Sequence, residues 1–532
     1  MVRHLAWALT ALLVVAFGFP STRAAAQAGA TLRVAIQADP TTLDPALTDD
    51  PTGTALLQDV YSPLLDLDSR GGLKLLAAKS WTVSPDGRTF HFTLRDGLKF
   101  QNGKPVTATD VKYTLDRLAN PKVDSPNADL LVAPIVGYAE EQAGKATGLS
   151  GVKVVDPAHV DITVDPTQGD ILVRLAHVAS GIVSRESVEA GGENWGTTHA
   201  NGTGPYTITE WSLRNQIVLT ANPGYFEGAP KIQRVVLEIV PDPTTDVAKY
   251  EAGELDITQV PGTDYTRLKR DATLGRQVVE YDRASTVFLA LNQFAYAPFK
   301  DVRVRRAIAY AINRPVLVRA IFAGLFTPAT GILPPQVPGY HPLAAIPYDP
   351  AKARATLAEA GYPQGRGLPP LVLGPNPRGY GPSQAAQAVA AMIHQNLGIE
   401  TRVQLLDIAK WRSDLKSRTA FSAVTGWTAD IADPNDYLYA LFVSKGPFIH
   451  FSGYNSPAYD KMVAAANRQP TRAGMLKQMG AVEKFLIVDD VGVVPIYYVR
   501  EAILLKPYVH NLTFTAYGLG FLEHLNTAAI VK

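Results

Sequence analysis

No cysteine occurs among the 532 residues of the chain. The protein therefore cannot form a disulfide bond, and it has no thiolate for a metal ion and no cysteine to which a lipid anchor could be attached. Its folded state must be stabilised by buried apolar surface, and a chain of this length can form more than one hydrophobic core.

A strong net charge is also missing, because 50 lysines and arginines face 49 acidic residues and leave a formal charge of +1. The sequence has no long run of like charge, no low-complexity tract and no short internal repeat. Nucleic-acid binding is not indicated, since it requires a clustered basic surface. A repetitive structural or adhesive protein is not indicated either.

The only long apolar run lies at the start, where Arg3 and His4 precede the stretch Leu5–Phe19. This stretch is shorter than the roughly 20 residues that a membrane-spanning helix needs. We therefore expect residues 1–26 to be a signal peptide, cleaved after Ala26, with Ala28 as the alternative. The mature protein is then expected in the periplasm, without a lipid anchor.

Catalytic motifs are missing as well. None of the ten histidines belongs to a His-Glu-x-x-His or His-x-x-Glu-His pattern, and neither a Gly-x-Ser-x-Gly elbow nor a phosphate-binding glycine loop with its lysine is found. We expect no enzymatic activity and no cofactor, and a periplasmic hydrolase is the disfavoured alternative. Histidines scattered in the sequence can still meet around a metal, so this option stays open for His177, His199, His394 and His450.

The most informative stretch that is present runs from residue 84 to residue 118. Ser84–Gly87 has the composition of a tight turn, and apolar residues then alternate with polar ones over Phe90–Leu94, which predicts a half-buried strand. Asn102-Gly103 predicts a second turn. A helix follows, with Thr109 or Asp110 as its cap.

Strand and helix patterns alternate along the rest of the chain, which indicates an α/β protein. The predicted strands are 31–37, 152–155, 160–164, 217–220 and 235–240. The predicted helices are 246–252, a helix capped by Asp301, a second one from Pro315, and 383–397. We expect the arginines at 303, 305 and 306 to form a solvated helix face, with an anion site as the alternative. The loop Gly202–Tyr206 is either a turn or a ligand contact.

From about residue 31 onwards these segments resemble, in order and in type, the family 5 extracellular solute-binding proteins, which are the oligopeptide, dipeptide and nickel receptors of ABC importers. The resemblance implies an α/β, two-lobed periplasmic-binding-protein fold of class II type, with three domains and a ligand cleft between the lobes. Domain I would comprise residues 29–60, 197–279 and 495–532, domain II residues 61–196, and domain III residues 280–494. The hinge would lie near 279–283 and 494–497.

The same resemblance implies a monomeric receptor that captures a dipeptide, an oligopeptide or a peptide-like solute. Closure of the lobes would convert binding energy into a change of shape, and the closed receptor would deliver the solute to the transmembrane subunits of an ABC permease. A nickel chelate, an opine or an oligosaccharide bound by the same fold is the alternative.

Gly426-Trp427-Thr428-Ala429-Asp430 is the most specific candidate for the binding site, since it resembles the amino-terminus site of peptide receptors. There, the matching aspartate holds the α-ammonium of the ligand, which implies that role for Asp430 and a pocket-lining role for Trp427. A cation buried in a cleft needs such a carboxylate to replace its lost hydration. The alternative for Asp430 and Asp433 is that they cap the helix that begins near Asn435, and for Asp433 we favour this cap.

Other candidates come from the remaining domains. The segment Arg378-Gly379-Tyr380-Gly381-Pro382 resembles a loop of dipeptide receptors whose arginine meets the peptide carboxylate, and a guanidinium suits that task because it donates two parallel hydrogen bonds. The alternative is an exposed turn. Trp411 is a candidate pocket wall or else a core side chain, and Asp39 and Thr41 are expected to face the cleft from domain I.

Overall fold

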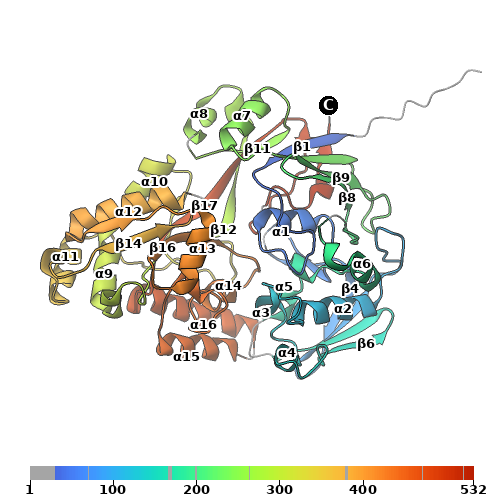
Figure 1. Cartoon of the computed structure of the whole chain (residues 1–532), viewed down its shortest axis with the longest axis horizontal. Helices are drawn as coiled ribbons and strands as arrows, with labels where there is room; N and C mark the ends of the chain where they lie inside the picture. The colour runs from blue at the N-terminus through green and yellow to red at the C-terminus, as the bar shows by residue number, and fades with distance from the viewer. Residues whose placement is uncertain are drawn as a thin grey trace, which may run out of the picture.

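Strands from distant parts of the sequence pair into one central sheet. The computed structural model describes residues 30–69, 71–165, 170–197, 200–262, 264–377, 381–469, 471–518 and 520–531. The central sheet has the strand order β15-β14-β16-β12-β17-β11-β1-β10-β9-β8, with β13 added to β17. Figure 1 shows this sheet passing through two lobes that lie side by side.

One lobe contains the first part of the chain. Its share of the central sheet is formed by β1 (Thr31–Ile36), β8 (Tyr206–Ser212), β9 (Gln216–Ala221), β10 (Arg234–Ile239) and β11 (Ile257–Gln259). β1 is parallel to β10 and to β11, whereas β9 is antiparallel to both β8 and β10. The helices beside these strands are α1 (Pro51–Gln58), α7 (Pro243–Glu251) and α8 (Tyr265–Arg270).

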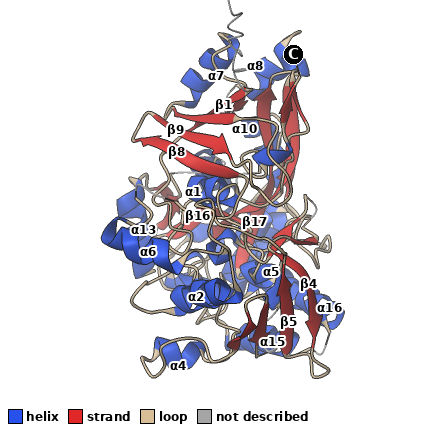
Figure 2. Ribbon diagram, turned by 90° about the vertical axis from the view of Figure 1, so that its right-hand side faces the viewer, coloured by secondary structure: helices blue, strands red, loops and turns tan. Residues whose placement is uncertain are grey.

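A separate sheet of order β4-β5-β7-β6 lies at the far end of this lobe (Figure 2). Its strands are β4 (Ala78–Val83), β5 (Thr89–Leu94), β6 (Val152–Asp156) and β7 (His159–Thr163), and β2 (Leu65–Leu67) pairs with β3 (Leu73–Leu75) nearby. The helices of this part are α2 (Ala108–Ala119), α3 (Ala128–Leu131), α4 (Tyr138–Gln142), α5 (Ile171–Arg174) and α6 (Arg185–Gly191).

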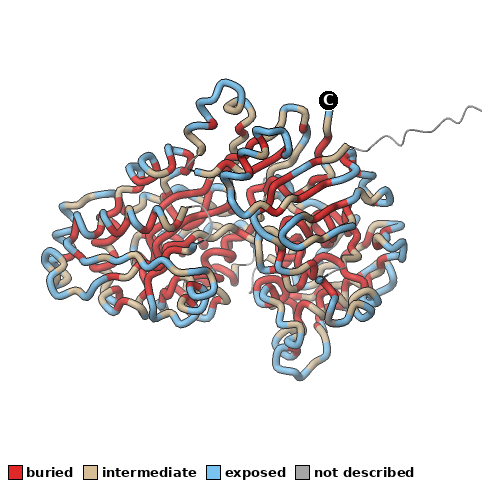
Figure 3. Tube along the Cα trace, turned by 45° about the horizontal axis from the view of Figure 1, so that its top comes forward, coloured by how far each residue is buried: buried red, intermediate tan, exposed pale blue. Residues whose placement is uncertain are grey.

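The other lobe is built on β14 (Leu371–Pro375), β15 (Thr401–Val403) and β16 (Ser422–Thr428), with β14 parallel to both neighbours. Its helices are α9 (Val302–Ala311), α10 (Arg314–Phe322), α11 (Pro350–Glu359), α12 (Pro382–Leu397), α13 (Ile408–Ser417), α14 (Asn435–Leu438), α15 (Pro457–Asn467) and α16 (Arg472–Lys484). Buried segments run through the interior of both lobes in Figure 3, so each lobe has a core of its own.

Two long strands join the lobes. β12 (Val278–Ala290) and β17 (Val493–Leu505) are 13 residues each and pair antiparallel, with breaks in register between Asp282 and Thr286 and between Val287 and Phe288. The buried ion pair of Arg283 with Glu501, at 2.5 Å, lies at the first of these breaks. The predicted hinge segments fall within these two strands, although the hinge and the three-domain division stay predictions. β13 (Thr327–Pro328), β18 (Val509–His510) and β19 (Ala529–Ile530) complete the strands in the described ranges.

Most predicted elements are present close to their predicted bounds, but three local predictions need correction. Helix α2 begins after Thr107 rather than after Thr109 or Asp110, because Asp110 accepts the backbone N–H of Thr107 in a capping box. Helix α7 begins at Pro243 because Asp242 caps it. Arg305 is not on a solvated face: its guanidinium is buried and pairs with Asp490 at 2.6 Å.

The loop Gly202–Tyr206 has a structural explanation. A side-chain carbon on Gly202 would lie 2.0 Å from the Val60 carbonyl oxygen, and one on Gly204 would lie 2.6 Å from the Asp59 carbonyl oxygen. Both glycines are therefore required for the close packing of this loop against the end of α1. The loop leads into β8, which the sequence patterns did not predict.

Candidate functional site

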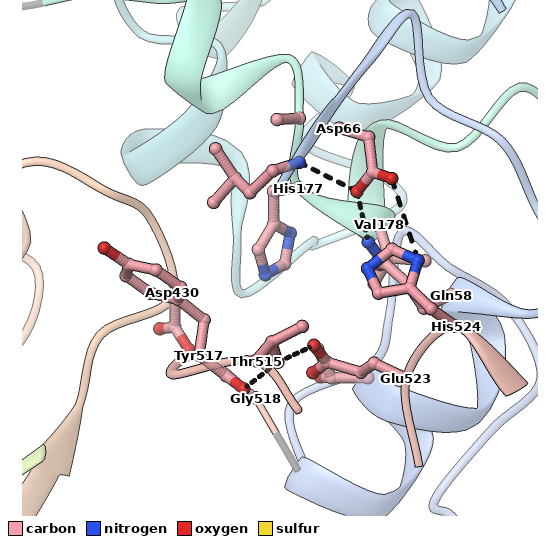
Figure 4. Close-up of a pocket in the computed structure, with 13 residues that line it drawn as sticks. Gln58, Asp66, His177, Val178, Asp430, Thr515, Tyr517, Gly518, Glu523 and His524 are labelled. Carbon is pink, nitrogen blue, oxygen red and sulfur yellow. Dashed lines mark hydrogen bonds and ion pairs between the residues drawn. The ribbon is translucent and has the colours of Figure 1, made fainter. Parts of the chain in front are cut away.

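A cavity lies where the two lobes meet. Its free volume is about 40 Å³, and its walls come from three parts of the chain. The first lobe supplies side chains between Thr54 and Val178, the second lobe supplies Asp430, and the C-terminal segment from Thr515 to His524 closes the remaining side. Figure 4 shows Asp430 across the cavity from Glu523 and His524.

Asp430 owes its position to the end of β16. The strand pairs with β12 as far as Thr428, and the chain then turns so that the backbone N–H of Asp430 donates to Oδ2 of Asp436 at 2.6 Å. Asp436 lies on α14 and is completely buried. Its carboxyl therefore fixes the backbone that presents Asp430 to the cavity.

The two aspartates differ in surroundings from ordinary surface carboxyls. Burial raises the pKa of Asp430 to about 7. The pKa of Asp436 is raised well above its usual range, chiefly by burial and to a smaller extent by the charge of Asp430. Hydrogen bonds from N–H groups of Asp430, Ile431 and Trp427 lower this pKa in part. A buried carboxyl of this kind is strongly stabilised in its charged form when a cation enters the site.

Asp433 bonds to the first residue of α14, but the N-cap position of this helix is Pro434 and not Asp433 as we favoured. Its Oδ1 accepts the backbone N–H of Asn435 at 2.9 Å, and the side-chain amide of Asn435 donates to the same oxygen. Its Oδ2 lies 3.4 Å from Nη1 of Arg472. Asp433 is buried and does not line the cavity.

Trp427, three residues before Asp430 in the chain, is not part of the cavity wall. Its ring is half-buried and packs against Phe448 and Phe451, with ring centroids 4.8 and 5.6 Å away. The Trp427 carbonyl accepts the hydroxyl of Tyr437 at 2.7 Å. The indole thus supports the loop of Asp430 from outside the cavity.

Trp411 is a core side chain. It is 1% exposed, its ring stacks on Phe421, and its Nε1 donates to the Gly374 carbonyl at 3.0 Å. A sequence pattern cannot tell a core tryptophan from one in a pocket wall, because both surroundings are apolar.

Asp39 and Thr41 serve the local structure of the first lobe. Asp39 accepts Nε1 of Trp211 at 2.8 Å and the backbone N–H of Arg214 at 3.0 Å. Thr41 is exposed, and both its backbone N–H and its hydroxyl donate to Asp50, which caps α1. Neither side chain lines the cavity. Arg378 and Tyr380 lie outside the described residues, so their proposed roles stay predictions.

Several lining residues carried no signal in the sequence. Asp66 is buried, pairs with Lys74 at 2.9 Å and lies 3.7 Å from Nδ1 of His524. Glu523 is buried and accepts the hydroxyl of Thr515. His177 lines the same cavity from the first lobe. These residues belong to no sequence motif. They are far apart in the sequence, and only the fold brings them to the same cavity.

Charged and apolar contacts join the lobes beside the cavity. Arg472 of α16 pairs with Asp170, the cap of α5, at 2.5 Å. Ile431, the residue after Asp430, is completely buried in the apolar core of the first lobe. The lobes are therefore in contact around the cavity in this structure.

Within the described ranges, no group of three or more histidine, aspartate or glutamate side chains is arranged to hold a metal ion. His177, His394 and His450 belong to no such group, and His199 lies outside the described residues. Among the described helices, none has both the length and the apolar composition of a membrane span.

Comparison with known proteins gives a consistent result. Residues 72–448 match the family model described as bacterial extracellular solute-binding proteins, family 5 Middle. The glutathione-binding protein GsiB of Salmonella typhi is 31% identical over 468 residues, which cover 85% of this chain and 86% of the relative. The GsiB of Shigella flexneri is 30% identical and covers 81% of this chain and 82% of its own length.

Solved structures show the same fold. The murein tripeptide binding protein MppA of Escherichia coli has a TM-score of 0.81 at 28% identity, covering 95% of this chain and 99% of its own. The unliganded open form of MppA has a lower TM-score of 0.74 at 27% identity, covering 95% and 98%. Haemophilus influenzae OppA in complex with the peptide RPPGFSPFR has a TM-score of 0.79 at 24% identity, covering 95% and 99%.

Proposed function

The chain belongs to family 5 of the bacterial extracellular solute-binding proteins, and we propose that its solute is a short peptide, or a peptide-like molecule, with a free amino group. The observation that carries this proposal is the carboxyl of Asp430, which lines the cavity between the lobes and has a pKa of about 7.

An ammonium group matches this carboxyl in charge and in hydrogen bonding. A primary ammonium that leaves water loses its hydration, and a carboxylate restores both the charge and the acceptors that it needs. Binding would also stabilise the ionised form of Asp430, which burial alone disfavours. Glu523 is a second acidic side chain in the cavity wall, whereas the charge of Asp66 is matched by Lys74.

The relatives support a peptide as the solute class. GsiB is named for glutathione and MppA for murein tripeptide, and both names denote short peptides. The cavity has a free volume of about 40 Å³ in this structure, less than the several hundred Å³ typical of ligand pockets, so the lobes would have to separate to admit a peptide. The predicted pairing of Arg378 with a peptide carboxylate would limit the length of that peptide.

We propose that the contacts between the lobes belong to the solute-capturing state. Arg472 and Asp170 come from different lobes. Ile431 follows Asp430 in the chain and is buried in the core of the opposite lobe. Separation of the lobes would break both contacts and open the cavity. The captured solute would then pass to an ABC permease. The receptor would act as a monomer that is exported to the periplasm after cleavage of residues 1–26.

The proposal is tested by native mass spectrometry of the protein isolated from its own periplasm, followed by denaturing release of any bound molecule. A released short peptide with a free amino group is the expected result. A metal chelate, an opine or a sugar that is released instead would contradict the peptide assignment. If the isolated protein is empty, calorimetric titration with dialanine, trialanine, glutathione and murein tripeptide tests the peptide assignment. Failure of all four to bind would also contradict that assignment.

A further inference from the structure

The ring of His177 occupies a defined place in the cavity wall. His177 precedes the short helix Val178–Ser180 and is its N-cap, with its Nδ1 accepting the backbone N–H of Ala179 at 3.1 Å. The residue is 7% exposed. Figure 4 shows the ring directed into the space between Asp430 and Thr515.

This capping bond determines which ring nitrogen carries the proton. A backbone N–H can only donate, so Nδ1 must be the acceptor, and a neutral imidazole then holds its single hydrogen on Nε2. Burial lowers the pKa of His177 to about 4, so the ring is neutral at physiological pH. The result is an N–H donor in a fixed orientation.

The donor has no acceptor of its own. Within the part of the chain that the structure describes, Nε2 of His177 has no hydrogen-bond partner, and its edge of the ring faces the cavity. His524, the other histidine in the wall, differs because a carboxylate, Asp66, lies 3.7 Å from its ring. The donor is accessible from the cavity, so a solute that carries an acceptor can bond to it there.

We propose that Nε2–H of His177 donates a hydrogen bond to a carbonyl oxygen of the bound solute, next to the amino group that Asp430 holds. In an amino-terminated peptide, the first carbonyl lies close to the ammonium, so one small cavity can contact both groups. Asp430 would select a cation, and His177 would select a cation that carries an adjacent acceptor. This inference rests on the proposed function.

Two substitutions distinguish the role of Nε2 as a hydrogen-bond donor from the role of Nδ1 in capping the short helix. His177→Asn keeps an acceptor oxygen near the position of Nδ1 but removes the donor at Nε2. His177→Gln places an amide N–H near the position of Nε2 but weakens the cap. His159→Asn is the matched control, because His159 is exposed on the hairpin of β6 and β7, away from the cavity.

The experiment is calorimetric titration of the unliganded full-length protein and its variants with whichever of dialanine, trialanine, glutathione and murein tripeptide binds the wild type most tightly. We expect His177→Asn to retain the wild-type unfolding temperature and to bind about 5- to 30-fold more weakly, the loss of one buried hydrogen bond. His177→Gln should recover part of this affinity, and His159→Asn should bind as the wild type does.

A second titration identifies the acceptor. In a thioamide analogue of the peptide, sulfur replaces the first carbonyl oxygen and is a weaker acceptor. The wild type should therefore bind the analogue more weakly than the parent peptide. The His177→Asn variant should bind the analogue and the parent peptide equally well. Equal affinity of the wild type and a folded His177→Asn variant would overturn the role of His177 while leaving peptide binding intact. Equal weakening by sulfur in both proteins would overturn the carbonyl assignment. Failure of the wild type to bind any of the four peptides would instead contradict the proposed function, and with it this inference.

Discussion

The carboxyl of Asp436 accepts the backbone N–H of Asp430 at 2.6 Å, so one buried aspartate holds in place the aspartate that lines the cavity. This relationship divides two roles between two residues of the same type. Asp430 is available to a solute, whereas Asp436 orients the loop that carries it.

Removal of the Asp430 carboxyl should abolish most of the affinity for an amino-terminated solute. Asp430→Ala is expected to weaken binding by about 2 to 5 kcal/mol, since it leaves a desolvated ammonium without its counter-charge. Calorimetry of the folded variant is the measurement. Asp433→Ala is not a suitable control because Asp433 is buried and paired, so the exposed Asp86→Ala on the first hairpin serves instead. Unchanged affinity of Asp430→Ala would remove the anchor role.

Binding should depend on pH around the pKa of Asp430, which is about 7 in the unliganded protein. An ammonium favours the ionised carboxyl, so binding releases a proton below pH 7, and affinity should rise by up to tenfold per unit as the pH increases from about 5 to 7. Above about pH 8 the amino group of the peptide loses its proton and affinity should fall. A profile without a rise between pH 5 and 7 would contradict the assignment.

The same pKa has a consequence for folding. A carboxyl whose pKa is raised on folding binds protons more readily in the native state, so its contribution to the free energy of unfolding decreases as the pH rises from about 4 to about 7. Asp430→Asn removes this contribution. The unliganded variant should therefore be more stable than the wild type at pH 8, on the order of 2 kcal/mol, and should lose that advantage at pH 4. Chemical denaturation at both pH values tests this expectation.

The ion pair between the lobes should favour the closed state. Arg472→Ala removes the partner of Asp170 and also the cation nearest to the buried Asp433, so we expect the closed state to be less populated and solute affinity to fall about 3- to 10-fold. Small-angle scattering should then show a more extended protein. Arg185→Ala is the matched control because Arg185 pairs with Glu189 on an exposed helix. Identical behaviour of the two variants would show that the pair does not contribute to closure.

Trp411 should matter for stability and not for recognition. Its replacement by alanine leaves a cavity in the core beside Phe421 and is expected to lower the free energy of unfolding by about 3 to 5 kcal/mol. The folded fraction should bind solute as the wild type does. A loss of affinity without a loss of stability would place this side chain in contact with the solute.

The sequence predicted local structure well where a few neighbouring residues determine it. The turn at Ser84–Gly87, the strand that follows it and the cap at Asp301 depend on side chains within four or five positions of each other, and all three are found. The start of α2 was misplaced because Thr107, Thr109 and Asp110 all suit a cap, and only the reciprocal bond with Asp110 selects Thr107. Arg305 was misjudged because its carboxylate partner, Asp490, is distant in sequence.

The site was predictable only in part for the same reason. Asp430 was singled out because its surrounding motif is local; it lines the cavity, and its role as an anchor stays a prediction. For Trp427 and Trp411, the choice between cavity and core depends on packing that a linear pattern does not contain. His177, Asp66 and Glu523 reach the cavity from separate elements, and no motif marks any of them.

The central claim is that the protein holds the amino group of its solute with Asp430. The most direct test is a calorimetric comparison, at pH 7.5, of a peptide that binds the wild type with the same peptide acetylated at its amino terminus, repeated with Asp430→Asn. We predict that acetylation weakens binding to the wild type by about 30-fold or more and has much less effect on the variant. Equal binding of the free and acetylated peptides by the wild type would contradict the account.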